Sequence, residues 1–405
     1  MGLSGGKGAA LLRINRDFSL DQLERGLEAL AAGECTLQLP HSITANAAGT
    51  ETALLQLIIT WARRAAADAT LKLHSKSDDD DGKRAFAQTA FGLTALNMAS
   101  AVEDRSGQPL DRYSLLTLAR DYVIAMAEKP ITALREFNKA SFSFLCVDNA
   151  RNYRRPIRLY VPGTDRVRDR SDFASLVKSC ASQFPGTQRL AGSETLEAAA
   201  SLLFEAFQNT HDHAQTDFRG DVLRRSVRGV IISFRFVRLD ALSRAGGASV
   251  PLQEYYAGWK PSVPIAKHAQ FLELGIFDGG PGLARRWLSH NEPLARDIHC
   301  GNHLSDEYKA VLGCLEKGAS TKSGSTSGNG LYRIMQVVKR TGGFIRIRTG
   351  NLSLVKPFDD SGTSLLPDDL RLLDLMTGTQ ALERRAWSEG TTISVLLPTN
   401  RAMAQ

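Results

Sequence analysis

The amino-acid sequence predicts an α+β protein, and two observations lead to this prediction. In the first 75 residues short β-like runs alternate with helical stretches, whereas beyond Gly192 helices and strands follow one another without regular βαβ alternation. The second arrangement is typical of layered α+β domains. With 405 residues, 43% of them hydrophobic, the chain has enough apolar side chains for the cores of roughly two or three domains.

The beginning of the chain, residues 1–82, is predicted to form a small α/β unit. Its β-like and helical runs follow from apolar spacing with periods of 2 and 3.6. They are, in chain order, Leu11–Ile14, Leu20–Ala32, Cys35–Leu39, Thr52–Ala67 and Thr70–Leu73. The acidic run Asp78–Asp81, followed by Gly82, cannot pack into a core, so we expect a surface loop there.

Three further segments follow this unit. Residues 83–150 are predicted to be mostly helical, residues 151–189 to form a connecting segment, and residues 190–405 to form a C-terminal domain. The β-like runs Ser141–Val147 and Pro156–Val161 lead into that domain. The last predicted elements are a helix at Leu370–Met376 and a strand at Thr391–Leu397.

Composition argues against several classes of protein. No stretch approaches the roughly 20 apolar residues of a membrane span, and the N-terminus lacks the apolar run of a secretory signal, so a cytoplasmic location is expected. The five cysteines are widely scattered, which predicts reduced thiols. Basic residues outnumber acidic ones by 50 to 43, but the clusters Arg151–Arg158 and Arg166–Arg170 lack interleaved aromatic residues. We interpret them as solvated surface and do not expect a nucleic-acid partner.

One predicted helix of the C-terminal domain carries a group of polar residues. Its apolar face consists of Leu196, Ala199, Leu203, Ala206 and Phe207. At about 100° per residue, Glu205, Asn209 and Asp212 lie within roughly 60° of one another on the opposite side, with His213 at the edge. An amide oxygen is a hard ligand for Mg²⁺, and a carboxylate one turn earlier can orient or deprotonate a hydroxyl. The alternative is the ordinary solvent face of an amphipathic helix.

Two glycine-rich loops follow that helix. The apolar run Phe271–Phe277 ends in Asp278–Gly282, where glycine lets the backbone approach a flat ring and the aspartate can accept a hydrogen bond from an exocyclic amine. Further on, seven of the 33 residues 318–350 are glycine, against 34 in the whole chain. The stretch Ser323–Gly330 leads directly into a periodic helix, whose N-terminus suits phosphate groups. The alternatives are a simple turn and a flexible linker.

Taken in this order, the elements resemble the conserved boxes of the GHKL ATPases, which include gyrase B, the ninety-kilodalton heat-shock chaperones, histidine kinases and mismatch-repair ATPases. The similar stretches are Glu205–Ala214, Asp278–Gly282, Gly328–Leu331 and Glu389–Thr392. The resemblance covers about residues 190–400. It implies a two-layer α/β sandwich, the Bergerat-type ATP-binding fold, with ATP and Mg²⁺ as cofactors and a long lid over residues 283–327.

The resemblance also implies a role for each matching residue. Asn209 would bind Mg²⁺, Glu205 would activate water or a hydroxyl, and Asp278 would recognise adenine. The other residues expected at the nucleotide are Asp212, His213, Gly280, Gly282, Lys322, Gly328, Gly330, Leu331 and Thr392.

Two functions remain open at this point. The first is a slow ATPase, a hydrolase that acts as a nucleotide-driven switch on a protein partner bound through the N-terminal region. The second follows from the first box, which is most similar to that of the anti-sigma-factor serine kinases: a protein serine/threonine kinase, or a module that sequesters its partner. Glu205 and Asp212 also match the gyrase and mismatch-repair pattern and favour the ATPase. A homodimer is compatible with either function.

Overall fold

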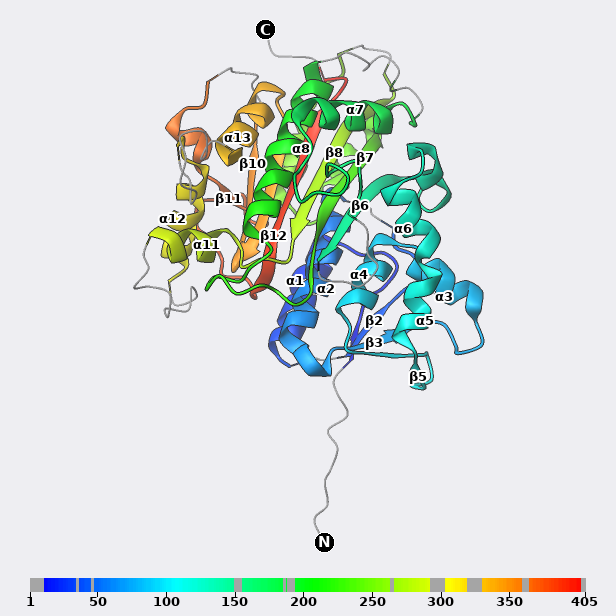
Figure 1. The fold of residues 1–405 in the computed structure, drawn as a ribbon. Coiled ribbons are helices and arrows are strands. Elements are labelled where there is room, and N and C mark those ends of the chain that lie inside the picture. Colours follow the sequence, from blue (N-terminus) through cyan, green and yellow to red (C-terminus); the bar gives the residue numbers. More distant parts are fainter. Residues whose placement is uncertain are drawn as a thin grey trace.

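The computed structural model has a mixed α+β architecture with two β-sheets (Figure 1), in agreement with the predicted class. The structure describes residues 11–33, 36–44, 47–148, 155–184, 187, 194–262, 266–291, 303–318, 330–358 and 364–401. Within these ranges no helix is long and apolar enough to cross a membrane.

The N-terminal unit is built on a five-stranded sheet in which β1 to β4 are parallel and β5 is antiparallel to β4. The strands are β1 (Leu11–Arg13), β2 (Thr36–Leu39), β3 (Thr70–Leu73), β4 (Ala101–Glu103) and β5 (Pro109–Leu110). The connecting helices are α1 (Leu20–Ala31), α2 (Thr50–Ala65), α3 (Asp80–Ala87) and α4 (Ala90–Met98). A capping box fixes the start of α1, because Ser19 and Gln22 each bond the other's backbone N–H.

The larger sheet has seven strands in the order β11-β10-β9-β12-β8-β7-β6, and every neighbouring pair is antiparallel. Its strands are β6 (Ser141–Asp148), β7 (Ser226–Arg238), β8 (His268–Asp278), β9 (Phe344–Gly350), β10 (Leu352–Pro357), β11 (Leu373–Asp374) and β12 (Ser388–Pro398). Because β6 is its edge strand, this sheet starts well before residue 190, where the sequence placed the beginning of the C-terminal domain.

Helices cover both faces of the seven-stranded sheet. On one face α8 contacts β7, β8 and β12, α13 contacts β9 and β12, and α7 packs against α8. On the other face α2 contacts β12, β8 and β7. The helices after α4 are α5 (Arg112–Leu118), α6 (Arg120–Ala127), α7 (Arg170–Ala181), α8 (Glu194–His213), α9 (Leu242–Ala245), α10 (Val250–Ala257), α11 (Leu283–Asn291), α12 (Leu304–Leu315) and α13 (Gly330–Arg340).

Three local predictions were wrong in whole or in part. The acidic run Asp78–Asp81 lies at the surface as expected, but its second half is helical, because Asp79 caps α3 by accepting a hydrogen bond from the Gly82 backbone N–H at 2.8 Å and carboxylates favour a helix N-terminus. Residues 156–161 form a turn with one isolated bridge. The predicted helix over residues 370–376 does not form: Leu370 ends a short 3-10 helix, Leu372 bonds the Tyr308 hydroxyl, and Leu373–Asp374 pair with β10 before a turn.

Helix α2 joins the N-terminal unit to the seven-stranded sheet. It is buried almost all round and contacts α1 and α4 as well as the sheet. Thr52, Gln56 and Thr60 are four residues apart on this helix, so their polar side chains all face the sheet. Thr52 bonds the Ser394 hydroxyl at 2.9 Å, and Thr60 accepts a hydrogen bond from the Glu389 backbone N–H at 2.9 Å. The helix is therefore seated on the sheet by directional contacts as well as by apolar packing.

The hydrogen bonds of Thr52, Gln56 and Thr60 to the sheet form a row that we call the polar seam, and Gln56 lies at its centre. Its Nε2 donates to the Arg348 carbonyl at 3.0 Å, and its Oε1 accepts from the Thr392 hydroxyl at 3.1 Å. Beside it, the buried Arg348 guanidinium forms two hydrogen bonds, of 2.9 and 3.0 Å, with the Glu24 carboxylate of α1. A buried ion pair of this kind is stable only where the remaining donors are also satisfied, and three backbone carbonyls and the Ser388 hydroxyl accept from the same guanidinium.

Gln56→Leu tests the seam. The variant leaves the Arg348 carbonyl and the Thr392 hydroxyl buried without their partner, so the free energy of unfolding should fall by about 1 to 3 kcal/mol. Denaturant unfolding measures this difference. The exposed Gln108→Leu serves as the control, and equal stability of the two variants would contradict the seam's role.

Candidate functional site

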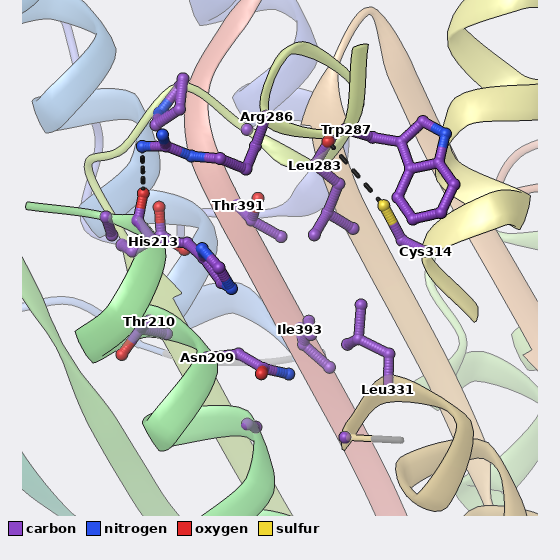
Figure 2. Close-up of a pocket in the computed structure, with 16 residues that line it drawn as sticks. Asn209, Thr210, His213, Leu283, Arg286, Trp287, Cys314, Leu331, Thr391 and Ile393 are labelled. Atoms are coloured by element: carbon purple, nitrogen blue, oxygen red, sulfur yellow. Dashed lines mark hydrogen bonds between the residues drawn. The ribbon is translucent and has the colours of Figure 1, made fainter. Parts of the chain in front are cut away.

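A cavity lies where the C-terminal half of α8 faces α11, α12 and the start of α13, beside the first part of β12 (Figure 2). Its volume is about 120 Å³, whereas roughly 10 to 15 Å³ is enough for one water molecule. It is therefore large enough to hold part of an organic ligand. Six of the residues expected at a nucleotide line it: Asn209, His213, Asp278, Gly282, Gly330 and Leu331.

Helix α8 supplies Asn209 and His213 from successive turns, and Figure 2 shows Asn209 beside the start of α13. The Asn209 amide forms no hydrogen bond to any residue that the structure describes, so its oxygen can serve a ligand. Asp212 does not line the cavity. It is exposed on the outer side of the helix, where its carboxylate accepts hydrogen bonds from Gln208 Nε2 at 3.0 Å.

Asp278 ends β8 at the wall of the cavity. Its Oδ1 accepts a hydrogen bond from the Gly280 backbone N–H at 2.8 Å, and the Thr391 backbone N–H also bonds the carboxylate. Burial raises the pKa of Asp278 to about 6, because the loss of water outweighs these bonds and the attraction of nearby arginines. Near neutral pH it is a buried acceptor facing a cavity. Gly280 itself packs on Ala214 and is not among the lining residues.

Two glycines allow the close approach of backbone around the cavity. Gly282 has a φ of +84°, and a Cβ there would lie 2.8 Å from the Thr349 hydroxyl, so only glycine fits this turn. At the start of α13, a Cβ on Gly330 would lie 2.9 Å from Asn209 Nδ2. The absence of a side chain at Gly330 therefore brings the N-terminus of α13 against the Asn209 amide.

The threonine at the cavity is Thr391, not Thr392. Thr391 and Ile393 line the cavity, whereas Thr392 points to the opposite face of the sheet and bonds Gln56 of α2. Strand residues alternate between faces, and the register of β12 against β9 shifts between Ser388 and Thr391. This irregularity decides which threonine faces the cavity, and it cannot be read from the sequence.

Several lining residues were not predicted. Arg286 of α11 closes one end of the cavity, where its Nη2 donates to the His213 carbonyl at 2.7 Å and to the Thr216 carbonyl at 3.0 Å. Trp287 adds an aromatic wall, and α12 can approach it because a Cβ on Gly313 would lie 2.9 Å from the indole. Arg286 and Trp287 lie about one turn into α11, which follows the Asp278–Gly282 turn, and the sequence offers no other indication that they line the cavity.

Glu205 lies one turn before Asn209 on α8, outside the cavity lining and almost fully buried. Two arginines hold its Oε1. Arg333 of α13 contacts it at 2.8 Å, and Arg170 at the start of α7 contacts the same oxygen. The sequence placed Arg170 in a cluster interpreted as solvated surface. Its spatial partner lies 35 residues away, a distance over which the sequence carries no signal.

The remaining predicted residues, Lys322 and Gly328, lie outside the described residues. In the described part no group of three or more His, Cys, Asp or Glu side chains is placed to hold a metal ion. The free cysteines among the described residues are Cys146, Cys180 and Cys314.

No protein-family model, no curated protein and no solved structure matches this chain.

Asp278→Asn tests the assigned pKa. The folded protein holds the Asp278 proton up to about pH 6, against an ordinary value of 3.8, so the wild type should lose stability relative to the variant as pH rises from about 4 to about 6. The change should be on the order of 3 kcal/mol, at 1.36 kcal/mol per pKa unit. Denaturant unfolding at stepped pH measures it, and Glu51, which titrates in the same range, cancels in the difference. A difference independent of pH would contradict the assignment.

Proposed function

We propose that this protein binds ATP with Mg²⁺ in the cavity beside α8 and uses the bound nucleotide as a switch. The main support is that four separate stretches of the chain contribute to one cavity: Asn209 from α8, Asp278 and Gly282 from the end of β8 and the turn after it, Gly330 from α13 and Thr391 from β12. Each has a chemistry suited to one part of the nucleotide. Part of the proposal is that residues 190–405 have the Bergerat-type sandwich of the GHKL family, since α8 and α13 cover one face of an antiparallel sheet.

The Asp278 end suits the base. A buried carboxylate accepts a hydrogen bond from the exocyclic amine of adenine, whereas guanine offers a carbonyl oxygen at the same position. The Gly282 turn and the Trp287 wall border a narrow space, which suits a flat ring. This end therefore discriminates between purines.

The Asn209 end suits the phosphates. Helix α13 begins at Gly330, and its first backbone N–H groups have no partner within the helix, so they can donate to anionic oxygens. The Asn209 oxygen, next to this terminus, is the group on this chain that would hold Mg²⁺, which when bound would neutralise charge on the phosphates. Glu205, one turn before Asn209 on α8, would orient or deprotonate the attacking water once it is free to accept a proton.

The switch is proposed because α2 contacts the back of the same strands. Thr391 lines the cavity and its neighbour Thr392 bonds Gln56 of α2. Ile59 of α2 also packs on Gly279, next to Asp278. A ligand that moved β12 or the Asp278 loop would therefore move α2, and with it the N-terminal unit, which would act on a protein partner.

Isothermal titration tests the ligand. ATP should bind the wild type in the presence of Mg²⁺, and both Asp278→Ala and Asn209→Ala should weaken binding by about 10- to 100-fold, since each removes a polar contact in a partly buried site. The exposed Asp240→Ala is the control. If neither cavity variant changed ATP affinity, the nucleotide would not lie in this cavity.

Phosphate release tests the role of Glu205. Glu205→Gln should still bind ATP but should release phosphate about 10²- to 10⁴-fold more slowly, the usual contribution of a general base. Glu197→Gln, an exposed position two turns earlier on α8, is the matched control. Hydrolysis at the wild-type rate in Glu205→Gln would assign the base to another group.

A further inference from the structure

Two arginines face one carboxylate at the phosphate end of the cavity. Arg333 Nη1 lies 2.8 Å from Glu205 Oε1, and Arg170 contacts the same oxygen. The Glu205 side chain is 11% exposed, whereas the two arginine side chains are 48% and 45% exposed. The carboxylate is therefore fixed inside the protein, and the two guanidinium groups reach it from the surface.

The charges of this cluster do not balance. One carboxylate neutralises one of the two guanidinium groups, which leaves a surplus of positive charge next to Asn209 and the start of α13. Guanidinium groups bind phosphate oxygens through paired hydrogen bonds. The surplus therefore favours an anion with more than one charge at this position.

Helices α8 and α13 place the arginines within reach of a phosphate chain. Gly330 packs on Asn209, and about one turn later on α13 Arg333 contacts Glu205, which lies one turn earlier on α8. The two helices therefore run antiparallel. One helical turn is about 5.4 Å. A group bound at the N-terminus of α13 is thus about one turn from the arginines.

The arginines also determine what Glu205 can do. Glu205 Oε1 already accepts hydrogen bonds from two guanidinium groups, which occupy the positions from which this oxygen could accept a proton from a water molecule. While both ion pairs exist, Glu205 is held in place without acting as a base. The same two arginines thus have two competing partners, the carboxylate and a polyphosphate.

We propose that Arg170 and Arg333 are positioning residues that select nucleoside triphosphates: they hold Glu205 until the terminal phosphates draw them away, which frees Glu205. The proposal rests on the proposed ATP site and adds the selection of ATP over ADP. Arg170 is anchored near this place, since its guanidinium stacks 5.5 Å from the Phe204 ring centre.

Titrations with adenosine, ADP and ATP, all with Mg²⁺, test the proposal. Wild type should bind ATP more tightly than ADP. In the double variant Arg170→Ala/Arg333→Ala, ATP affinity should fall by about tenfold or more, the ATP-to-ADP ratio should collapse, and adenosine affinity should stay unchanged. The exposed Arg340→Ala, on the same helix as Arg333, is the control for lost surface charge.

Glu205→Gln gives a second readout that a structural role would not produce. Because it removes the competing carboxylate, ATP should bind several-fold more tightly, and this gain should disappear when both arginines are replaced. Unchanged ATP affinity in Glu205→Gln, or an ATP-to-ADP ratio that survives the double variant while adenosine still binds, would overturn the proposal and leave the ATP site intact. Failure of adenosine and ATP alike to bind the wild type would overturn the site itself.

Discussion

The packing of α2 against the seven-stranded sheet is the constraint on which the rest of the structure depends. This helix belongs to the N-terminal unit by sequence, yet Gln56 bonds both β9 and β12. The neighbouring pair of Glu24 and Arg348 adds a buried ionic contact between the same two parts. Directional bonds of this kind fix how the two parts are placed, whereas apolar packing alone would tolerate sliding. A shift of β9 or β12 should therefore also shift the N-terminal unit.

The cavity follows from the other face of the same strands. The irregularity of β12 turns Thr391 toward α8 and Thr392 toward α2, so one short segment serves both the cavity and the seam. Glycine at the start of α13 then lets this helix close on Asn209. The proposed function uses this arrangement. A ligand in the cavity would contact Thr391, and α2 contacts the next residue, Thr392, on the other face of β12. Ligand binding and the position of α2 can therefore be linked.

The sequence was informative where local patterns determine structure. The apolar spacing around Glu205 and Asn209 predicted α8, and the glycine loop around Asp278 predicted the turn after β8. It was not informative where distant segments meet. Register and packing between segments far apart in the chain determine three features: the pairing of Arg170 with Glu205, the face to which Thr392 points, and the packing of α2 on the sheet. The acidic start of α3 differs from these cases, because a run of carboxylates is compatible both with an exposed loop and with a helix N-terminus capped by Asp79.

The most direct test of the nucleotide site is a crystal structure of the protein with Mg²⁺ and a non-hydrolysable ATP analogue. We expect the base against Asp278 and Thr391, the phosphates at the N-terminus of α13, and Asn209 at the metal ion. We also expect Glu205 to be no longer paired with both arginines. An analogue bound elsewhere at saturating concentration, with this cavity empty, would contradict the proposed nucleotide site.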